Sequence, residues 1–436
     1  NILLFYRLFW IIIYGCRTNR HFFNIRVPES VKMTVFFYFT DSGWSMAMDQ
    51  VRIGVIGMGG IGASQVKNIL QLPNCRLTAV CDWKKDKMEP PYIPSDVNVK
   101  KFTDDDDFFA YGEFDAVMLE IPHYQHVPLA LRCLEEGKHV LIEKPVAVDK
   151  KTALQLLTAE KKYPDLRIGA MFNQRTVPAH KKVKELIESG ELGLIRRVNW
   201  IMTDWFRTQR YYDSGDWRAT WRGEGGGVLI NQCPHHLDLM QWFFGMPNRV
   251  TAVVALGKYH NIEVEDDVTA ILEYPNGSTG VFIASTGEAP GTNRLEITAE
   301  RGRVVLENGK LSFLRNEIPM SEFCKTTQVT WSTPPVWNID IPTVANNPRQ
   351  LIDVIDAFAN SILHGTPMVA RAVEGINSLE IGNAILLSGL KKKSVDLPLD
   401  ENEFSEMLAE LVASSKWEKA AHGENNDFDF EKSQPK

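Results

Sequence analysis

The chain has 436 residues, which exceeds the roughly 250–300 residues at which a single hydrophobic core stops growing, so we expect two domains. Hydrophobic residues make up 44% and charged residues 24%, values that are typical of a globular protein in water. The formal net charge of −7 argues against a nucleic-acid partner, which needs a basic face. The six cysteines form no CxxC pair, and this favours a reducing, cytoplasmic compartment without a disulfide framework.

The first residues, "NILLFYRLFWIIIYGC", are strongly apolar, but Arg7 divides them. Neither piece reaches the roughly 17–25 residues that a membrane helix needs, and no signal-peptide pattern is clear, so we expect no membrane partner. We expect residues 1–49 to be an upstream translation or a disordered extension, with Met46 or Met48 as the natural start. The polar tail at 416–436 is also expected to be disordered.

Short apolar segments and helical segments alternate over residues 50–172. The segments "VRIGVIG", "CRLTAVCD", "FDAVMLEIP" and "HVLIEKP" have the composition of buried strands, and "GASQVKNILQLP" and "HVPLALRCLEEGK" have that of helices. This alternation predicts a parallel sheet covered by helices, and therefore an α/β fold.

The pattern changes over residues 173–400, where the apolar runs become longer. "YPNGSTG" and "AERGRV" carry hairpin-type turn signals between such runs. The segments 347–365 and 372–393 have the spacing of amphipathic helices. We therefore predict a second domain with a mostly antiparallel sheet that is covered by helices on one face.

The hexapeptide "GMGGIG" directly follows the first strand and opens a helix, as the dinucleotide-binding fingerprint requires. Gly57 allows the tight turn, Gly59 lets the backbone approach a pyrophosphate, and Gly62 lets helix and strand pack closely. Asp82 follows at about the expected 20 residues, where a carboxylate accepts from ribose hydroxyls and repels a 2′-phosphate. NAD is thus favoured over NADP, although Lys84 and Lys85 weaken this preference. The expected cofactor contacts here are Gly57, Met58, Gly59, Gly60, Ile61, Gly62, Asp82 and Trp83.

Two further polar groups carry the candidate chemistry. Glu143 and Lys144 end the strand "HVLIEKP", at the edge where ligands bind in parallel sheets, and a lysine there could polarise a reacting hydroxyl. If residues 231–243 are helical, Asn231, His235 and Asp238 share one stripe, and His235 is a candidate proton carrier. Asn231 could instead be an N-cap, and His235 a histidine of the core. "CPHH" suggests zinc, but no second cluster completes four ligands, so we predict no metal.

These motifs, in this order, resemble the glucose–fructose oxidoreductase / inositol dehydrogenase (Gfo/Idh/MocA) family over about residues 50–400. The quoted marks are "GVIGMGGIG", "IPHYQHVPLALRCLEEGKHVLIEKPVA", "FNQR", "SGELGLIRRV", "GGGVLINQCPHHLDLMQWFFG" and "VDLPL". The resemblance implies an N-terminal Rossmann domain plus a C-terminal α/β domain with a large, mostly antiparallel open sheet. That sheet often forms the oligomer face in the family, which implies a homodimer or homotetramer.

The resemblance also implies roles for single residues. Lys144 matches the family's catalytic lysine, and His235 matches its acid/base histidine. Asn231 departs from the aspartate that polyol dehydrogenases commonly carry, so it could orient a sugar hydroxyl but could not make the histidine more basic. The cofactor-side element of the family is matched by Pro122 and His126, with His123 in place of the usual asparagine.

An aromatic and arginine-rich segment, "TDWFRTQRYYDSGDWRATWRGE", precedes the glycines. Aromatic faces stack on sugars and arginines donate to ring hydroxyls, although the same residues are also enriched at subunit interfaces. The candidate substrate contacts are Trp205, Arg207, Tyr211, Trp217, Arg218 and Trp221, together with Arg175, Lys144, Asn231 and His235.

Three functions fit these features. The first is an NAD(H)-dependent dehydrogenase of a sugar, glycoside or cyclitol, which the segment around "WRATWRGEGGG" favours by its resemblance to sugar and glucoside dehydrogenases, including 3-dehydrogenases. The second is a glycosidase or lyase that uses NAD transiently and releases no net NADH. The third is a non-enzymatic NAD-binding regulator, which would need neither Lys144 nor His235.

Overall fold

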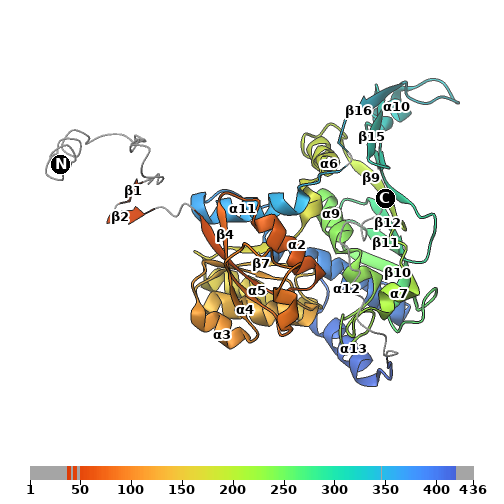
Figure 1. Cartoon of the computed structure of the whole chain (residues 1–436). Coiled ribbons are helices and arrows are strands. Elements are labelled where there is room, and N and C mark those ends of the chain that lie inside the picture. The colour runs from red at the N-terminus through yellow and green to blue at the C-terminus, as the bar shows by residue number, and fades with distance from the viewer. Residues whose placement is uncertain (1–36, 41–42, 47–49, 345, 419–436) are drawn as a thin grey trace, which may run out of the picture. The chain divides into compact units, whose positions relative to one another are not determined.

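The computed structural model describes residues 37–40, 43–46, 50–344 and 346–418 (Figure 1). The chain divides into two units, 1–49 and 50–436. In the first unit, strand β1 (Phe37–Thr40) pairs antiparallel with β2 (Gly43–Met46). The expectations for residues 1–36, Met48 and 419–436 lie outside the described residues. Among the residues that are described, no helix is both long and apolar enough to cross a membrane.

The second unit begins with a six-stranded sheet in which every pair of neighbours is parallel. Its order is β5–β4–β3–β6–β7–β8, the strand order of a Rossmann fold. The long apolar runs form these strands because helices cover both faces of the sheet. This confirms the predicted parallel, helix-covered sheet. The strands are β3 (Val51–Ile56), β4 (Cys75–Cys81), β5 (Lys100–Phe102), β6 (Ala116–Leu119), β7 (His139–Ile142) and β8 (Ile168–Ala170).

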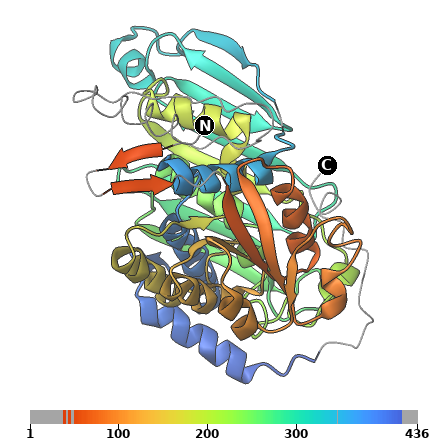
Figure 2. The ribbon, with the colours of Figure 1, turned by 60° about the vertical axis from the view of Figure 1, so that its left-hand side comes forward.

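The helices of this sheet divide between its two faces. Val117 and Leu119 of β6 point into the core that contains α4, whereas Ile53 of β3 points into the core of the opposite face. Figure 2 shows α13 beside α5, which it contacts. The bounds of the helices around this sheet are α2 (Gly60–Ile69), α3 (Asp105–Tyr111), α4 (His126–Glu135), α5 (Lys150–Lys162) and α13 (Glu401–Ser414).

Helix α11 (Gln350–His364) packs on the first sheet although it lies far along the chain. Ile355 and Phe358 of α11 are fully buried in the same cluster as Ile53 and Val66. The sequence reveals the apolar stripe of this helix, but a stripe does not specify which sheet it covers. Residues that we had grouped with the second domain therefore complete the core of the first.

A nine-stranded mixed sheet forms the rest of the unit, in the order β16–β15–β14–β13–β9–β12–β11–β10–β17. Only the pair β9–β12 is parallel, and the two predicted hairpins join β11 to β12 and β13 to β14. This confirms the mostly antiparallel sheet. The strands are β9 (Ile195–Met202), β10 (Arg249–Leu256), β11 (Glu265–Glu273), β12 (Thr279–Ser285), β13 (Asn293–Ala299), β14 (Gly302–Glu307), β15 (Lys310–Asn316), β16 (Val336–Ile341) and β17 (Val395–Asp396).

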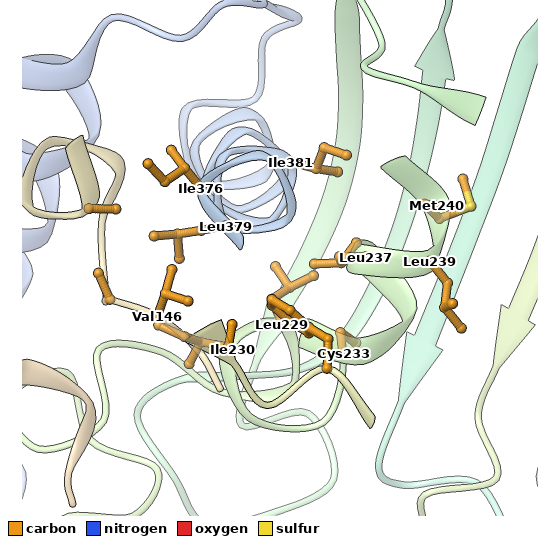
Figure 3. Packing of buried hydrophobic residues seen from close by; sticks show 14 of the residues in the cluster. Val146, Leu229, Ile230, Cys233, Leu237, Leu239, Met240, Ile376, Leu379 and Ile381 are labelled. Atoms are coloured by element: carbon orange, nitrogen blue, oxygen red, sulfur yellow. The ribbon is translucent and has the colours of Figure 1, made fainter. Parts of the chain in front are cut away.

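Helix α12 (Gly375–Lys391) fixes the segment that carries the candidate histidine. It packs against β10 and against α9 (Pro234–Phe244), and its Leu379 lies beside Val146 and Leu229 (Figure 3). Each fully buried Leu or Ile of such a cluster contributes about 1.5–3 kcal/mol to folding. Because Val146 follows the strand-end lysine, this cluster holds residues 228–240 against that strand end.

Candidate active site

A cleft of about 1070 Å³ lies at the carboxyl ends of the strands of the parallel sheet. Such ends are where ligands bind in this kind of sheet. The cleft also takes residues from the segment between β9 and α9, so it joins the two halves of the unit. Of the residues selected from the sequence, its walls contain Gly57, Gly59, Gly60, Ile61, Asp82, Trp83, Pro122, His123, Glu143, Lys144, Trp205, Arg207, Tyr211, Trp217, Arg218, Asn231 and His235.

The glycine loop has the shape that a bound pyrophosphate needs. Gly57 has φ +95°, and a Cβ there would lie 2.2 Å from the Glu120 carbonyl oxygen. A Cβ on Gly62 would lie 1.9 Å from the Gly57 oxygen, whereas one on Gly59 would meet no atom within 4 Å. Gly59 is the N-cap of α2 and has no side chain to satisfy the first amides. These amides are therefore available to phosphate oxygens, and the loop fits a dinucleotide.

Asp82 is held firmly at the end of β4. One carboxylate oxygen accepts from the Met58 N–H at 2.7 Å, and the other accepts from the Lys84 N–H at 2.8 Å. Each oxygen keeps a lone pair for a ribose hydroxyl. Trp83 is 79% exposed, and the Lys84 ammonium lies 4.7 Å from the centre of its ring. The side chain of Met58 is fully buried, so Met58 serves the cofactor site only through its main-chain N–H, which holds Asp82.

Lys144 lies just past the carboxyl end of β7, and the Lys144–Pro145 peptide bond is cis. Its ammonium donates to the main-chain oxygen of Asn231 at 2.8 Å. Burial lowers the pKa of Lys144 from its usual value, and the carboxylates of Glu143 and Glu224 oppose this effect. A lysine with a lowered pKa gives up its proton more readily than an exposed one.

The segment that carries His235 is not the continuous helix considered from the sequence. A short helix, α8 (Val228–Asn231), ends at Asn231, and α9 begins afresh with Pro234 at its first turn. Cys233 is the N-cap of α9, so the capping role considered for Asn231 is wrong. Asn231 and His235 nevertheless both line the cleft.

The imidazole of His235 is in a state suited to accept a proton. Burial, and secondarily the charge of Lys144, holds the pKa of His235 well below its usual range. Within the described part of the chain, its Nδ1 is buried without a hydrogen-bond partner. The edge-to-face contact with Phe172 adds an apolar wall. The ring is therefore neutral near pH 7 and has an unused nitrogen.

Gly227, the last of the three glycines before α8, packs closely against a neighbouring strand. A Cβ on Gly227 would lie 1.9 Å from the Glu265 carbonyl oxygen. The Glu265 carboxylate accepts from the N–H groups of Gly227 and Leu229, which caps the first turn of α8. At Gly227 the absent side chain thus makes room for a second backbone and not for a ligand.

An aromatic and cationic wall closes the other side of the cleft. The Arg218 guanidinium lies 4.6 Å from the Trp217 ring centre and donates to the Tyr211 hydroxyl at 3.0 Å. Arg207 lies over Trp205 at 5.0 Å. These five side chains present flat faces and N–H donors together, which is the chemistry expected for a sugar pocket.

Trp221 differs from the rest of that segment because it is not part of the cleft wall. Its side chain is only 3% exposed. The main-chain N–H of Trp221 donates to Glu263, and its main-chain oxygen accepts from the Tyr124 hydroxyl. Trp221 therefore anchors the loop from behind, and its expected contact with substrate is not supported.

Arg175 lies in a buried ion cluster and not in the cleft. Its Nε and one terminal nitrogen contact both oxygens of Asp238, at 2.7 and 2.6 Å, and the other terminal nitrogen contacts Glu374 at 2.5 Å. Arg175 is 3% exposed, and Asp238 is 1% exposed. The expected substrate role of Arg175 is thus wrong for a physical reason: the buried Asp238 carboxylate and the Glu374 carboxylate occupy its guanidinium.

His126 is also away from the cleft wall, but it supports that wall. Its Nδ1 lies 2.6 Å from the Pro145 oxygen, and its Nε2 lies 2.8 Å from the Ile121 oxygen. The ring thereby ties the segment after β6 to the segment after β7. His126 thus orients the strand end that carries Lys144 without reaching the cleft itself.

Two glutamates of the site were missed from the sequence. Glu120 follows β6 and lines the cleft, and burial raises its pKa well above the usual range, with Glu143 adding to the effect. Glu224 is 1% exposed and contacts the side chain of Asn231. The one available signal was Glu120 itself, a charged residue inside the apolar run "VMLEIP".

Together, the glycine loop, the strand-end carboxylate and the lysine–histidine cleft define a dinucleotide-dependent oxidoreductase. Residues 51–168 match the model of an oxidoreductase family with an NAD-binding Rossmann fold, and residues 180–305 match the GFO/IDH/MocA C-terminal domain. The chain belongs to the Gfo/Idh/MocA family of oxidoreductases. Both the predicted family and the NAD cofactor are confirmed.

Several curated relatives are similar at low identity. Inositol 2-dehydrogenase of Rubrobacter xylanophilus is 28% identical over 45% of this chain and 52% of its own length, so the match spans about half of that protein. Myo-inositol 2-dehydrogenase of Thermotoga maritima is 25% identical over 59% of this chain and 75% of its own. Levoglucosan dehydrogenase of Pseudarthrobacter phenanthrenivorans is 24% identical over 66% and 80%, respectively.

Solved structures share the fold. The WlbA dehydrogenase of Bordetella pertussis, in complex with NADH and UDP-GlcNAcA, has a TM-score of 0.67 at 24% identity and covers 80% of this chain and 100% of its own. Levoglucosan dehydrogenase with NADH and L-sorbose has a TM-score of 0.68 at 19% identity, over 81% and 100%. At this identity the likeness establishes the arrangement of the two sheets and no more.

Proposed function

We propose that the protein is an NAD(H)-dependent dehydrogenase that acts on a ring hydroxyl of a sugar, glycoside or cyclitol. One observation carries the proposal. Lys144, from the parallel sheet, donates a hydrogen bond to the main-chain oxygen of Asn231, four residues before His235, and all three line the cleft of the glycine loop. The relatives whose names specify inositol and levoglucosan support the same substrate class.

The cofactor would be held by the glycine loop, Asp82 and Trp83 at one end of the cleft and by Pro122, His123 and Glu143 at the other. When bound, NAD supplies the acceptor for a hydride. NAD is preferred over NADP because Asp82 presents a carboxylate where a 2′-phosphate would have to lie.

The catalytic roles follow from the charges of the side chains. Lys144 donates a hydrogen bond to the reacting hydroxyl and lowers the cost of losing its proton. Burial keeps the pKa of His235 low, so its ring is neutral, and a ring nitrogen of His235 takes that proton. The Asn231 amide holds the ring hydroxyl in place, and Trp217 and Arg218 contact the remaining faces and hydroxyls of the sugar.

The oligomeric state and the cellular location of the enzyme are also proposals. The face of the nine-stranded sheet that faces away from α9 and α12 carries Val253 and Ile271, which are 73% and 50% exposed. Exposed apolar residues on a sheet face are typical of subunit contacts, so we propose a homodimer or homotetramer through this face. A cytoplasmic location would fit the scattered cysteines, of which Cys75, Cys81, Cys133 and Cys233 are buried and unbonded.

A substrate screen tests the proposal. Inositols, levoglucosan, hexoses and methyl glucosides are offered separately with NAD⁺ and NADP⁺, and formation of reduced cofactor is followed by absorbance. We expect NADH formation with at least one of these compounds, and faster reaction with NAD⁺. Conversion of a glycoside without net NADH would favour the transient-redox glycosidase or lyase, and binding of NADH without conversion of any compound would favour the regulator.

A further inference from the structure

Glu224 lies at the centre of a buried network beside the candidate active site. Glu224 is 1% exposed, and the three glycines that follow it are buried as well. The Asn231 Nδ2 donates to one carboxylate oxygen, and the Ala219 N–H donates to the other at 2.6 Å. The main-chain oxygen of Glu224 lies 3.0 Å from His123 Nδ1. Glu224 thus connects the cofactor side of the cleft with the substrate side.

The backbone at Ala219 is strained where it meets Glu224. Ala219 has φ +51°, a region that residues with a Cβ rarely adopt, and it is fully buried. Strain of this kind persists where surrounding contacts fix it, and it collects at functional sites. The hydrogen bond from the Ala219 N–H to the Glu224 carboxylate is such a contact.

The charges around Glu224 are compatible with a carboxylate at this place. Burial raises the pKa of Glu224 above its usual value, whereas Arg218, the N–H groups of Ala219 and Asn231, and Lys144 favour its charged form. Both side-chain oxygens accept from N–H donors, and neither the Ala219 amide nor the Asn231 amide nitrogen can accept in return. Only a group with two acceptors satisfies both neighbours.

We propose that Glu224 is a positioning residue that orients the amide of Asn231 for substrate. By accepting from Nδ2, it leaves Oδ1 of Asn231 as an acceptor for a donating ring hydroxyl next to Lys144. This inference rests on the proposed function, since it names how the same site recognises its sugar. Glu224 itself is not expected to touch the substrate.

Three variants test the proposal through donor and acceptor matching. In Glu224→Gln, one side-chain atom becomes a donor and meets another donor, so we expect KM for the sugar to rise at least tenfold while the Kd for NADH stays within twofold. In Glu224→Gln/Asn231→Asp, the new glutamine accepts from the Ala219 N–H and donates to the new aspartate. This double variant should recover at least fivefold in KM relative to Glu224→Gln.

The single variant Asn231→Asp gives a pH signature that a structural role would not. It places two carboxylates in contact, and they must share a proton, so kcat/KM should fall as pH rises from about 6 to about 9 more steeply than in the native enzyme. Glu263→Gln is the control. Glu263 also accepts from a main-chain N–H near Glu224, that of Trp221, but it does not line the cleft. A native KM in Glu224→Gln, or no recovery in the double variant, would overturn the proposal.

Crystal structures of the NADH complexes give a readout that needs no turnover. In Glu224→Gln we expect the glutamine oxygen to keep the Ala219 N–H and the glutamine NH2 group to face Asn231, so that the Asn231 side chain turns, whereas Glu263→Gln keeps Asn231 in place. An unchanged Asn231 in Glu224→Gln would refute the positioning role even if no sugar is found to react. Failure of the native enzyme in the sugar screen would count against the proposed function alone.

Discussion

The Lys144 ammonium lies 2.8 Å from the main-chain oxygen of Asn231, although 87 residues separate the two in sequence. Lys144 lies just past the end of a parallel strand, and Asn231 is the last residue of a short helix that packs on the mixed sheet. One cleft therefore receives a cation from one sheet and polar side chains from the elements of the other.

The pH dependence of kcat/KM should reflect two lowered pKa values. His235 must be neutral to accept a proton, so activity is present above its pKa and lost as pH falls through it. Because burial lowers that pKa, the acid limb should lie below about 6.5, the usual value for histidine. Lys144 must be charged, and its lowered pKa should place the alkaline limb below about 10.4. An acid limb above the usual histidine value would contradict this account.

Asp82 should control the choice of cofactor. Its carboxylate repels a 2′-phosphate, so Asp82→Ser should raise the ratio of kcat/KM with NADP to that with NAD by at least tenfold, since Lys84 and Lys87 already line this end of the cleft. Steady-state kinetics with both cofactors measure the ratio. Lys67→Ser serves as the control, because Lys67 lies on α2 and does not line the cleft. An unchanged ratio in Asp82→Ser would remove the basis for preferring NAD.

Arg175 should matter for stability and not for substrate binding. Arg175→Met leaves Asp238 buried without its cation, and such a loss costs about 3–5 kcal/mol in the free energy of unfolding. Thermal or urea unfolding measures this, and KM of the remaining folded enzyme should stay near the native value. Arg249→Met, which removes an exposed pair with Asp396, should leave the midpoint almost unchanged. A raised KM with native stability would return Arg175 to the substrate site.

Local patterns in the sequence predict most of the residues that form the cofactor-binding end of the cleft. The turn at Gly57, the close packing at Gly62 and the carboxylate at Asp82 are fixed by contacts within one βαβ unit, so their spacing shows in the sequence. The parallel sheet and both hairpins were predicted for the same reason.

Contacts between distant segments were harder to predict. Arg175 was assigned to the substrate because a sequence does not reveal that the carboxylates of Asp238 and Glu374 pair with it in the fold. Glu224 was missed because a single glutamate before glycines has no periodic signal, and its contact with Asn231 forms across a turn. The expected helix over 231–243 begins only at Pro234 in the structure, because proline favours the first turn of a helix.

Single-turnover reduction of NAD⁺ by Lys144→Met, at saturating levels of a sugar found in the screen, tests the central claim most directly. Lys144 lies beside Asn231 and, in the proposed mechanism, donates to the reacting hydroxyl, so its loss should slow the step at least about a hundredfold, the usual contribution of a proton-transfer group. The Kd for NADH, measured by fluorescence, should stay within twofold of native. A native rate of reduction in this variant would contradict the assignment of the lysine–histidine cleft as the reacting centre.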